Sequence, residues 1–203
     1  MLTYDVTEEG PYTIRLKTTD KAGRTTGLDE NISFIIDSTA PVVTIDGAEN
    51  GSYNPKNVLV TISVYEHNFR TNTVDIEVTR NGAEYPHFPV ERWKNSGQTS
   101  QLIYDFTEDG HYTIKVTSID KAGNGPVTST LTFTVDKTTP VIDITGVDNS
   151  EHYNVNKTVT MTIIDTNLDI NNVTVTKDGQ SYNAGNFQVS GDKATLIHTF
   201  TAE

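Results

Sequence analysis

The sequence YDFTEDGHYTI at residues 104–114, followed by DKAGN at residues 120–124, decides how the chain is organised. Nearly the same letters, YDVTEEGPYTI and DKAGR, occur at residues 4–14 and 20–24, which lie 100 positions earlier (104 − 4 and 120 − 20). A repeat of this length, with the same spacing between its two parts, indicates a whole domain repeated in tandem rather than a short solenoid motif.

The composition narrows the classes of function. The formal net charge of −12 argues against nucleic acid as a partner, because binding it requires a basic face. The charge also argues against an anionic membrane surface, and no apolar stretch is long enough to span a bilayer. The first residues do not have the pattern of a signal peptide, and Met1 leads directly into strand-like sequence, so we expect a piece of a longer chain. The absence of Cys excludes disulfides and thiol chemistry.

The middle of the chain alternates apolar and polar side chains, which is typical of strands with one buried face. Asn81-Gly82 is a strong two-residue turn signal, and Pro86 and Pro89 place the strand around them at a sheet edge. The pattern predicts an all-β fold of tandem seven-stranded antiparallel Ig-like β-sandwiches. The seven predicted strands of the central repeat lie at residues 42–46, 58–64, 74–78, 85–90, 102–106, 112–116 and 131–135.

Two similar linkers divide the chain. DSTAP at residues 37–41 and DKTTP at residues 136–140 are 99 positions apart (136 − 37). We therefore predict the last part of a repeat at residues 1–37, a complete repeat at residues 38–136, and the first part of another at residues 137–203. Because each linker is short, ends in Pro and lacks Gly, we expect it to be stiff and to hold neighbouring repeats in a near-linear relation.

The two end parts are complementary. Residues 1–37 carry predicted strands at 2–6, 12–16 and 32–36. Residues 137–203 carry the first five strands of a repeat, predicted at 141–145, 159–163, 173–175, 187–189 and 196–200. Two interpretations stay open. The end parts of different molecules exchange strands and form a homo-oligomer, or each end is partly folded through contacts with its own neighbour.

Tyr12 and Tyr112 each follow a glycine by two residues, at the start of a predicted strand. This is the placement of a tyrosine corner, in which the phenol hydrogen-bonds to backbone a few residues upstream. We predict a structural role for both, with a cost of about 1 kcal/mol when the hydroxyl of Tyr112 is removed.

Asp20 and Asp120 begin the two DKAG turns, and Gly23 and Gly123 supply the positive φ that such a turn needs. We predict structural roles for these four residues as well. Acidic residues near the junctions raise the question of calcium, but no loop has the dense alternating pattern of a dedicated site, so we predict no metal site.

One short segment, around Trp93, has no counterpart in the following repeat. Trp93 with Phe88 and Arg92 is the candidate ligand-binding set, with sugar stacking as one use of the indole. The alternative is that Trp93 caps the core beside an edge strand.

The sequence contains no catalytic motif. Its five His residues are scattered without metal-ligand spacing, and no Ser lies in a nucleophile elbow. A thin sandwich offers no cleft for converging carboxylates. We predict a non-enzymatic protein without a cofactor.

The motifs DKTTP, Tyr153, DTN at residues 165–167, FTEDGHY at residues 106–112 and DKAGN resemble the bacterial Ig-like tandem repeats of large extracellular proteins. They are also similar to hyalin-repeat and fibronectin type III modules. The resemblance implies a secreted or cell-surface location, including attachment to the cell wall, and neighbouring Ig-like repeats as partners. It implies a structural spacer or stalk, an adhesive module for a glycan or host protein, or an accessory domain of a secreted carbohydrate-active enzyme.

Overall fold

A computed structural model describes residues 3–27, 32–67, 69, 72–169 and 174–202. The chain divides into two compact units, Met1–Val135 and Asp136–Glu203. The described residues contain strands, turns and loops and no α-helix, so the all-β prediction is confirmed. Over the same residues, no helix has the length and apolar character that a membrane crossing needs.

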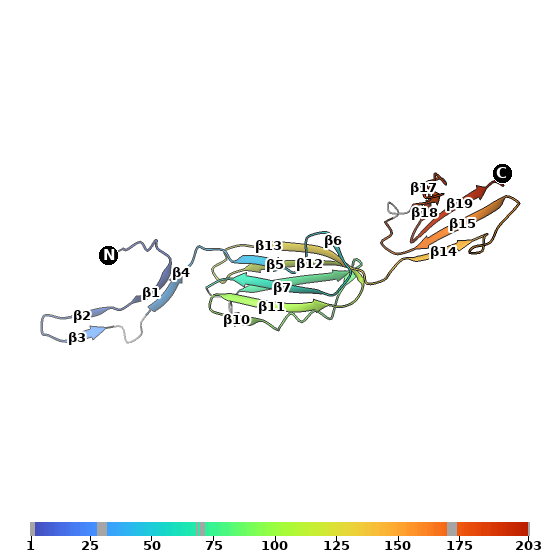
Figure 1. Ribbon diagram of the computed structural model, residues 1–203. Helices are drawn as coiled ribbons and strands as arrows, with labels where there is room; N and C mark the ends of the chain where they lie inside the picture. Colours follow the sequence, from blue (N-terminus) through green and yellow to red (C-terminus); the bar gives the residue numbers. More distant parts are fainter. Residues whose placement is uncertain (1–2, 28–31, 68, 70–71, 170–173, 203) are drawn as a thin grey trace. The chain divides into compact units, whose positions relative to one another are not determined.

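The central repeat of the first unit consists of two sheets (Figure 1). The first sheet is antiparallel, with strand order β10-β11-β7-β5. Its strands are β5 (Val42–Asp46), β7 (Val58–Tyr65), β10 (Lys94–Ser96) and β11 (Thr99–Phe106). The second sheet has the order β6-β13-β12-β8-β9. Its strands are β6 (Ser52–Asn54), β8 (Thr73–Arg80), β9 (Ala83–Glu84), β12 (Gly110–Ile119) and β13 (Val127–Val135).

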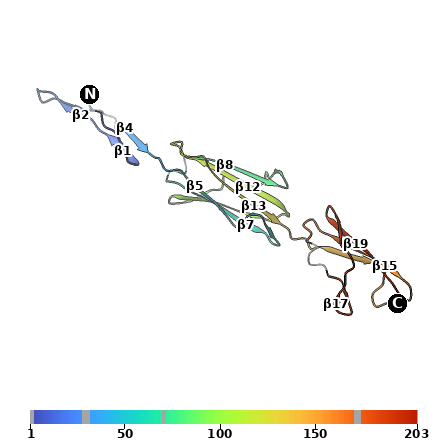
Figure 2. The ribbon, with the colours of Figure 1, turned by 90° about the horizontal axis from the view of Figure 1, so that it is seen from above.

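The core lies between these sheets, which pack face to face (Figure 2). Along β7, buried Val60, Ile62 and Val64 alternate with more exposed neighbours, as the sequence pattern predicts. Phe106 of the first sheet contacts Tyr112 of the second, with ring centroids 4.8 Å apart. Burial of each such side chain stabilises the fold by about 1.5–3 kcal/mol.

The strands of the central repeat differ from the predicted seven in one region. The strand predicted at residues 85–90 does not form; this segment is made of turns. Pro86 and Pro89 cannot donate to a ladder, and Tyr85 and Phe88 are instead anchored by burying their rings. The short strands β9 and β10 flank the segment, and β6 is an additional strand.

Strand β6 runs parallel to β13 at the edge of the second sheet. The amide of Asn54 donates to the carbonyl of Thr134 at 3.1 Å. Just before β6, the side-chain oxygen of Asn50 accepts from the backbone N–H of Thr132 at 2.9 Å, and the N–H of Gly51 donates to the Thr132 carbonyl at 2.7 Å. Side-chain and backbone groups together therefore satisfy the backbone hydrogen-bonding groups of β13 at this edge.

The first 36 residues contain two small antiparallel pairs of strands. The pairs are β1 (Gly10–Ile14) with β4 (Ile32–Ile36), and β2 (Lys17–Thr19) with β3 (Thr25–Gly27). The strand predicted at residues 2–6 is wrong for the described part, since residues 3–9 have no strand, and Leu2 lies outside the described residues. Its counterpart β11 pairs with β7, and the described N-terminal residues have no β7 equivalent.

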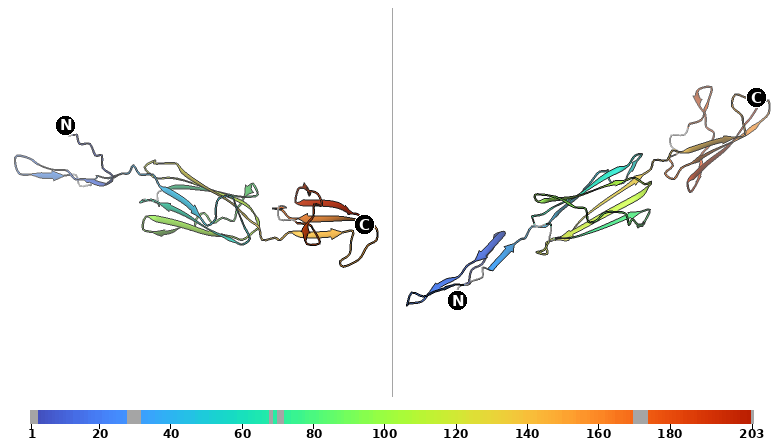
Figure 3. Two further views of the ribbon diagram at one scale, coloured as in Figure 1. Left: turned by 45° about the horizontal axis from the view of Figure 1, so that its top comes forward. Right: turned by 90° about the horizontal axis from the view of Figure 1, so that it is seen from below.

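The second unit contains one four-stranded sheet in the order β14-β15-β19-β18 (Figure 3). Its strands are β14 (Val141–Thr145), β15 (Lys157–Ile164), β18 (Gln188–Ser190) and β19 (Lys193–Phe200). A small hairpin joins β16 (Thr176–Lys177) to β17 (Gln180–Ser181). Of the strand predicted at residues 173–175, Val173 lies outside the described residues, and residues 174–175 are in no strand. The equivalent β8 pairs with β12, for which the described part of this unit has no counterpart.

Candidate functional site

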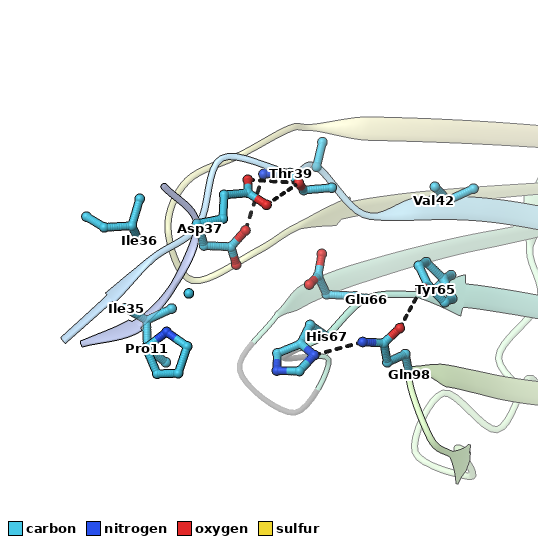
Figure 4. A pocket seen from close by; sticks show the side chains of 13 residues that line it. Pro11, Ile35, Ile36, Asp37, Thr39, Val42, Tyr65, Glu66, His67 and Gln98 are labelled. Atoms are coloured by element: carbon cyan, nitrogen blue, oxygen red, sulfur yellow. Dashed lines mark hydrogen bonds between the residues drawn. The ribbon is translucent and has the colours of Figure 1, made fainter. Parts of the chain in front are cut away.

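The first unit contains a pocket of about 400 Å³, formed by β1, β4, the linker and two loops of the central repeat (Figure 4). Pro11, Ile35 and Val42 supply apolar surface, and Tyr65 and His67 supply polar groups. The pocket combines an apolar wall with a few hydrogen-bonding side chains, which is the usual character of a small-ligand site.

Three side chains on one wall of the pocket form a hydrogen-bonded chain (Figure 4). The Tyr65 hydroxyl donates to the side-chain oxygen of Gln98. The Gln98 amide nitrogen then faces Nδ1 of His67 at 2.8 Å. Because an amide nitrogen can only donate, Nδ1 accepts this bond, and the proton of the neutral imidazole sits on Nε2. The chain fixes the orientation of all three side chains.

The carboxylate of Glu9, also at the pocket, is occupied by the linker. It accepts from the backbone N–H of Ser38 at 2.8 Å and from the Thr39 hydroxyl at 2.9 Å, and it also bonds the Ser38 hydroxyl. The bonds from Ser38, followed by those from Thr39, lower the pKa of Glu9. A carboxylate held in this way is a poor general base.

Both linkers begin with the same turn. The carboxylate of Asp37 accepts from the N–H of Thr39, and that of Asp136 from the N–H of Thr138, each at 3.2 Å. Asp136 also accepts from the side-chain amide of Asn167 at 2.7 Å. The bond from Asn167 is the main cause that lowers the pKa of Asp136. In both linkers, side-chain hydrogen bonds therefore hold the first three residues in a turn.

The turn at residues 120–124 contacts the linker at residues 37–41 through the side chain of Asn124. Asp120 accepts from the backbone N–H of Asn124 at 2.8 Å and from its side-chain amide at 2.7 Å. That amide also donates to the carbonyl of Asp37 at 3.0 Å. Burial raises the pKa of Asp120, but the bonds from Asn124, Gly123 and Ala122 outweigh it, and the pKa lies below its ordinary value. Gly123 has a φ of 93°, which a side chain would strain.

The matching turn at residues 20–24 is exposed. Asp20 accepts from the N–H of Ala22 and of Arg24, each at 2.9 Å, and forms an ion pair with the Arg24 side chain at 2.7 Å. The backbone bond from Arg24 and its side chain lower the pKa of Asp20. Gly23 has a φ of 81°. All four predicted turn residues thus lie in the turns, with Asp as the acceptor and Gly at positive φ.

The two predicted corner tyrosines make the same bond. The hydroxyl of Tyr112 donates to the carbonyl of Glu108 at 2.8 Å, and that of Tyr12 donates to the carbonyl of Glu8 at 2.8 Å. Tyr112 is fully buried, and burial raises the pKa of its phenol, which keeps the proton that the bond uses.

The candidate ligand-binding residues around Trp93 are not gathered on one surface. Trp93 is half-buried against the core, with its ring 4.9 Å from that of Phe69. Phe88 lies in the core against Tyr104 at 5.2 Å, so its ring is not available to a ligand. Arg92 is exposed. The structure supports the interpretation that Trp93 caps the core.

The pocket residues Tyr65, His67 and Gln98 were not predicted as a site. The sequence places Tyr65 at the end of a strand and His67 in the loop that follows. This position indicates that the two side chains are exposed, but it does not by itself indicate a binding site. Gln98 comes to them only through the pairing of β11 with β7, and no local sequence signal indicates that pairing.

No group of three or more His, Cys, Asp or Glu residues in the described part of the chain could hold a metal ion. The carboxylates of Asp120 and Asp136 accept hydrogen bonds within turns, and that of Glu9 accepts from the linker. The described residues thus form a β-sandwich with two hydrogen-bonded linkers and a pocket beside the first linker.

The two packed sheets of the central repeat define an Ig-like sandwich, and one known family matches part of the chain. Residues 98–182 match the family model described as "Bacterial Ig-like domain (group 3)". The bacterial Ig-like resemblance is thereby confirmed. The matched segment begins inside the first compact unit and ends inside the second, so its ends do not coincide with the boundary after Val135.

The solved structures that the chain is similar to include tandems from titin. A chimeric titin Z1Z2-Z1Z2 tandem is 17% identical, with 80% of this chain and 85% of that chain covered and a TM-score of 0.31. The I9-I11 tandem from titin is 15% identical, with 94% of this chain and 64% of that chain covered and a TM-score of 0.26. No curated protein matches the chain. The fold of the central repeat is defined by its two sheets and their strand order.

Proposed function

We propose that the chain is a non-catalytic spacer in a secreted or surface protein of a bacterium. The observation that carries the proposal is the repeated construction of the linkers. Each begins with an Asp-to-Thr turn, and each Asp is bonded by an Asn side chain, Asn124 to the carbonyl of Asp37 and Asn167 to the carboxylate of Asp136. A spacer needs connections that resist bending, and hydrogen bonds that fix a short linker supply that resistance.

The family match supports the proposed location. Bacterial Ig-like domains commonly occur in extracellular and surface proteins. The acidic balance of the chain, with a formal net charge of −12, favours solubility and keeps neighbouring molecules apart. The absence of Cys means that such a spacer would not depend on the redox state of its compartment.

The spacer proposal is tested by the distance distribution between two spin labels. The chain has no Cys, so single cysteines at Glu84 and Lys193, both exposed, can carry the labels. We expect a narrow distribution in the native sequence. Replacing residues 138–140 with three glycines should broaden it at least about twofold, because the turn and the Pro are removed. The substitution Thr138→Ser, which retains the hydroxyl, serves as the control.

Equally broad distributions for the native and the glycine linkers would contradict the spacer proposal. Such a result would show that the hydrogen bonds at the linker do not limit its motion.

An adhesive module is the second candidate. The observation that favours it is exposed Arg92 beside half-buried Trp93, in a segment that the next repeat lacks. On a glycan array, this role predicts binding that is lost in Arg92→Ala and in Trp93→Ala but kept in Trp93→Phe, which retains a ring against Phe69. The adhesive role would be contradicted if the native chain bound no glycan and Trp93→Phe kept the native melting temperature. The spacer role would then be the remaining candidate.

A further inference from the structure

The central repeat contains three Asn-Gly pairs, at residues 50–51, 81–82 and 124–125, each in a turn or loop. In such a pair the backbone nitrogen of Gly can attack the side-chain amide of Asn, because Gly has no side chain to hinder the approach. The attack closes a five-membered imide and needs no enzyme. Whether it occurs in the folded chain depends on the hydrogen bonds that hold the attacking nitrogen and the amide.

Asn81-Gly82 is the two-residue turn between β8 and β9, with φ values of 52° and 80°. Both residues are exposed. Among the described residues, none accepts a hydrogen bond from the N–H of Gly82 or from the side-chain amide nitrogen of Asn81. At this pair, therefore, no hydrogen bond has to break before the nitrogen of Gly82 attacks or before the amide nitrogen of Asn81 leaves.

The side-chain oxygen of Asn81 lies in a polarising environment. It accepts from the backbone N–H of His111 at 2.8 Å. The guanidinium of Arg80 lies close by, because a Cβ added to Gly110 would be 2.8 Å from Nε of Arg80 and 3.3 Å from Oδ1 of Asn81. An N–H donor and a positive charge beside a carbonyl oxygen stabilise the negative charge that develops on this oxygen during attack.

The pair Asn50-Gly51 is exposed as well, but its attacking nitrogen is held. The N–H of Gly51 donates to the carbonyl of Thr132 at 2.7 Å. The side-chain oxygen of Asn50 accepts from the N–H and from the hydroxyl of Thr132, each at 2.9 Å. The nitrogen of Gly51 can turn toward the amide only after these bonds to β13 break.

The pair Asn124-Gly125 is protected in a different way. Asn124 is half-buried, and its amide nitrogen donates to the carboxylate of Asp120 at 2.7 Å and to the carbonyl of Asp37 at 3.0 Å. This is the nitrogen that must leave as ammonia. At this pair the hydrogen bonds therefore hold the leaving group, whereas at Asn50-Gly51 they hold the attacking group.

We propose that Asn81 is a site of spontaneous deamidation in the folded protein and that Asn50 and Asn124 are protected. The nitrogen of Gly82 gives its proton to solvent and bonds to Cγ of Asn81. The bond from Cγ to the amide nitrogen breaks, and this nitrogen takes up a proton and leaves as ammonia. Water then opens the imide at either carbonyl, which gives aspartate or isoaspartate. This inference concerns a modification of the chain and does not depend on the spacer role.

The two products differ in their effect on the turn. The equivalent turn of the second unit is Asp178-Gly179, and Asp178 has the same φ of 52° as Asn81. An aspartate at residue 81 therefore fits the turn. Isoaspartate adds a methylene to the main chain, so a two-residue turn can no longer place Arg80 opposite Ala83. Deamidation thus converts part of the molecules to a form with a distorted β8–β9 turn.

The experiment follows the mass gain of deamidation at each Asn by peptide mass spectrometry. The full chain is incubated at pH 8, once folded and once unfolded in urea. In the folded chain, Asn81 should convert at least about tenfold faster than Asn50 and Asn124, because those two must first lose hydrogen bonds. In urea the three should convert at similar rates, since each is followed by Gly. The proposal is overturned if Asn81 stays intact in the folded chain while it converts in urea. It is also overturned if Asn50 or Asn124 converts as fast as Asn81 in the folded chain.

A pair of variants tests the cause of the protection. Asp120→Ala removes the carboxylate that holds the amide of Asn124, so conversion at Asn124 should rise while that at Asn81 stays unchanged. Lys121→Ala, at the exposed neighbour, should leave both rates unchanged. An unchanged rate at Asn124 in folded Asp120→Ala would contradict the protection by this bond. The comparison of the three residues in the native chain needs no variant, so it decides even if Asp120→Ala does not fold.

Discussion

The two parts that flank the central repeat each reproduce some of its strands but bury them to a smaller extent. Tyr12 and Tyr112 both donate to the carbonyl four residues upstream, at the same distance of 2.8 Å. Ile114, two residues beyond Tyr112, is fully buried, whereas Ile14 is half exposed. The corner bond is local and forms wherever the sequence occurs. Burial is not local, because it depends on a second sheet that lies elsewhere in the chain.

This difference predicts the largest effect for a core aromatic. Phe106→Ala should destabilise the central repeat by about 3–5 kcal/mol, because Phe106 is fully buried against Tyr112 and Phe133. The equivalent Phe200→Ala should cost clearly less in the second unit, where that ring is half-buried. Urea unfolding followed by intrinsic fluorescence and by circular dichroism measures both. Equal costs would show that the second unit is as well packed as the central repeat.

A smaller effect is expected at the tyrosine corner. Tyr112→Phe should lower the free energy of unfolding by about 1 kcal/mol, because the Glu108 carbonyl loses its buried donor. Tyr12→Phe should cost little, since water can replace the hydroxyl at its exposed site. Differential scanning calorimetry of the two variants makes the comparison. An unchanged melting temperature in Tyr112→Phe would contradict the structural role of this bond.

The smallest effect concerns pH. The folded pKa of Asp120 lies below its ordinary value of about 3.9, so the unfolded chain binds more protons in acid. The stabilisation is therefore present above about pH 4 and is lost as the pH falls through the folded pKa. Unfolding measured between pH 2 and 6 should show a weaker pH dependence in Asp120→Asn. Lys121→Ala, which leaves the turn acceptor in place, should retain the native dependence.

The sequence pattern was sufficient where the signal repeats along one strand. The alternation at residues 58–64 and 112–116 predicted β7 and β12. Successive side chains of a strand point to opposite faces, so apolar and polar residues alternate when one face is buried. The pattern failed at residues 85–90. Turns in this segment direct the rings of Tyr85 and Phe88 into the core, so the spacing of its apolar residues is similar to that of a strand although no strand forms. The pattern also missed β6, since its three residues pair in parallel with a strand about 80 positions away.

The site was less predictable than the fold. The turn residues Asp20, Asp120, Gly23 and Gly123 could be assigned because their bonds span no more than four residues. The pocket residues Tyr65 and Gln98 are 33 positions apart, and a strand pairing brings them together. Trp93 was ambiguous because a large aromatic in an unmatched segment is equally compatible with a ligand contact and with a core cap.

The contacts made by Asn50 and β6 on β13 have a consequence for any protein built from such repeats. Neighbouring copies of similar sequence are held at high local concentration, and an open strand edge on one copy is a template for the wrong strand of the next. Asn50 and Gly51 occupy both backbone groups of Thr132, and β6 pairs with the residues that follow. The β13 edge of the second sheet is therefore already hydrogen-bonded, so a strand of a neighbouring repeat cannot pair with it and misassemble.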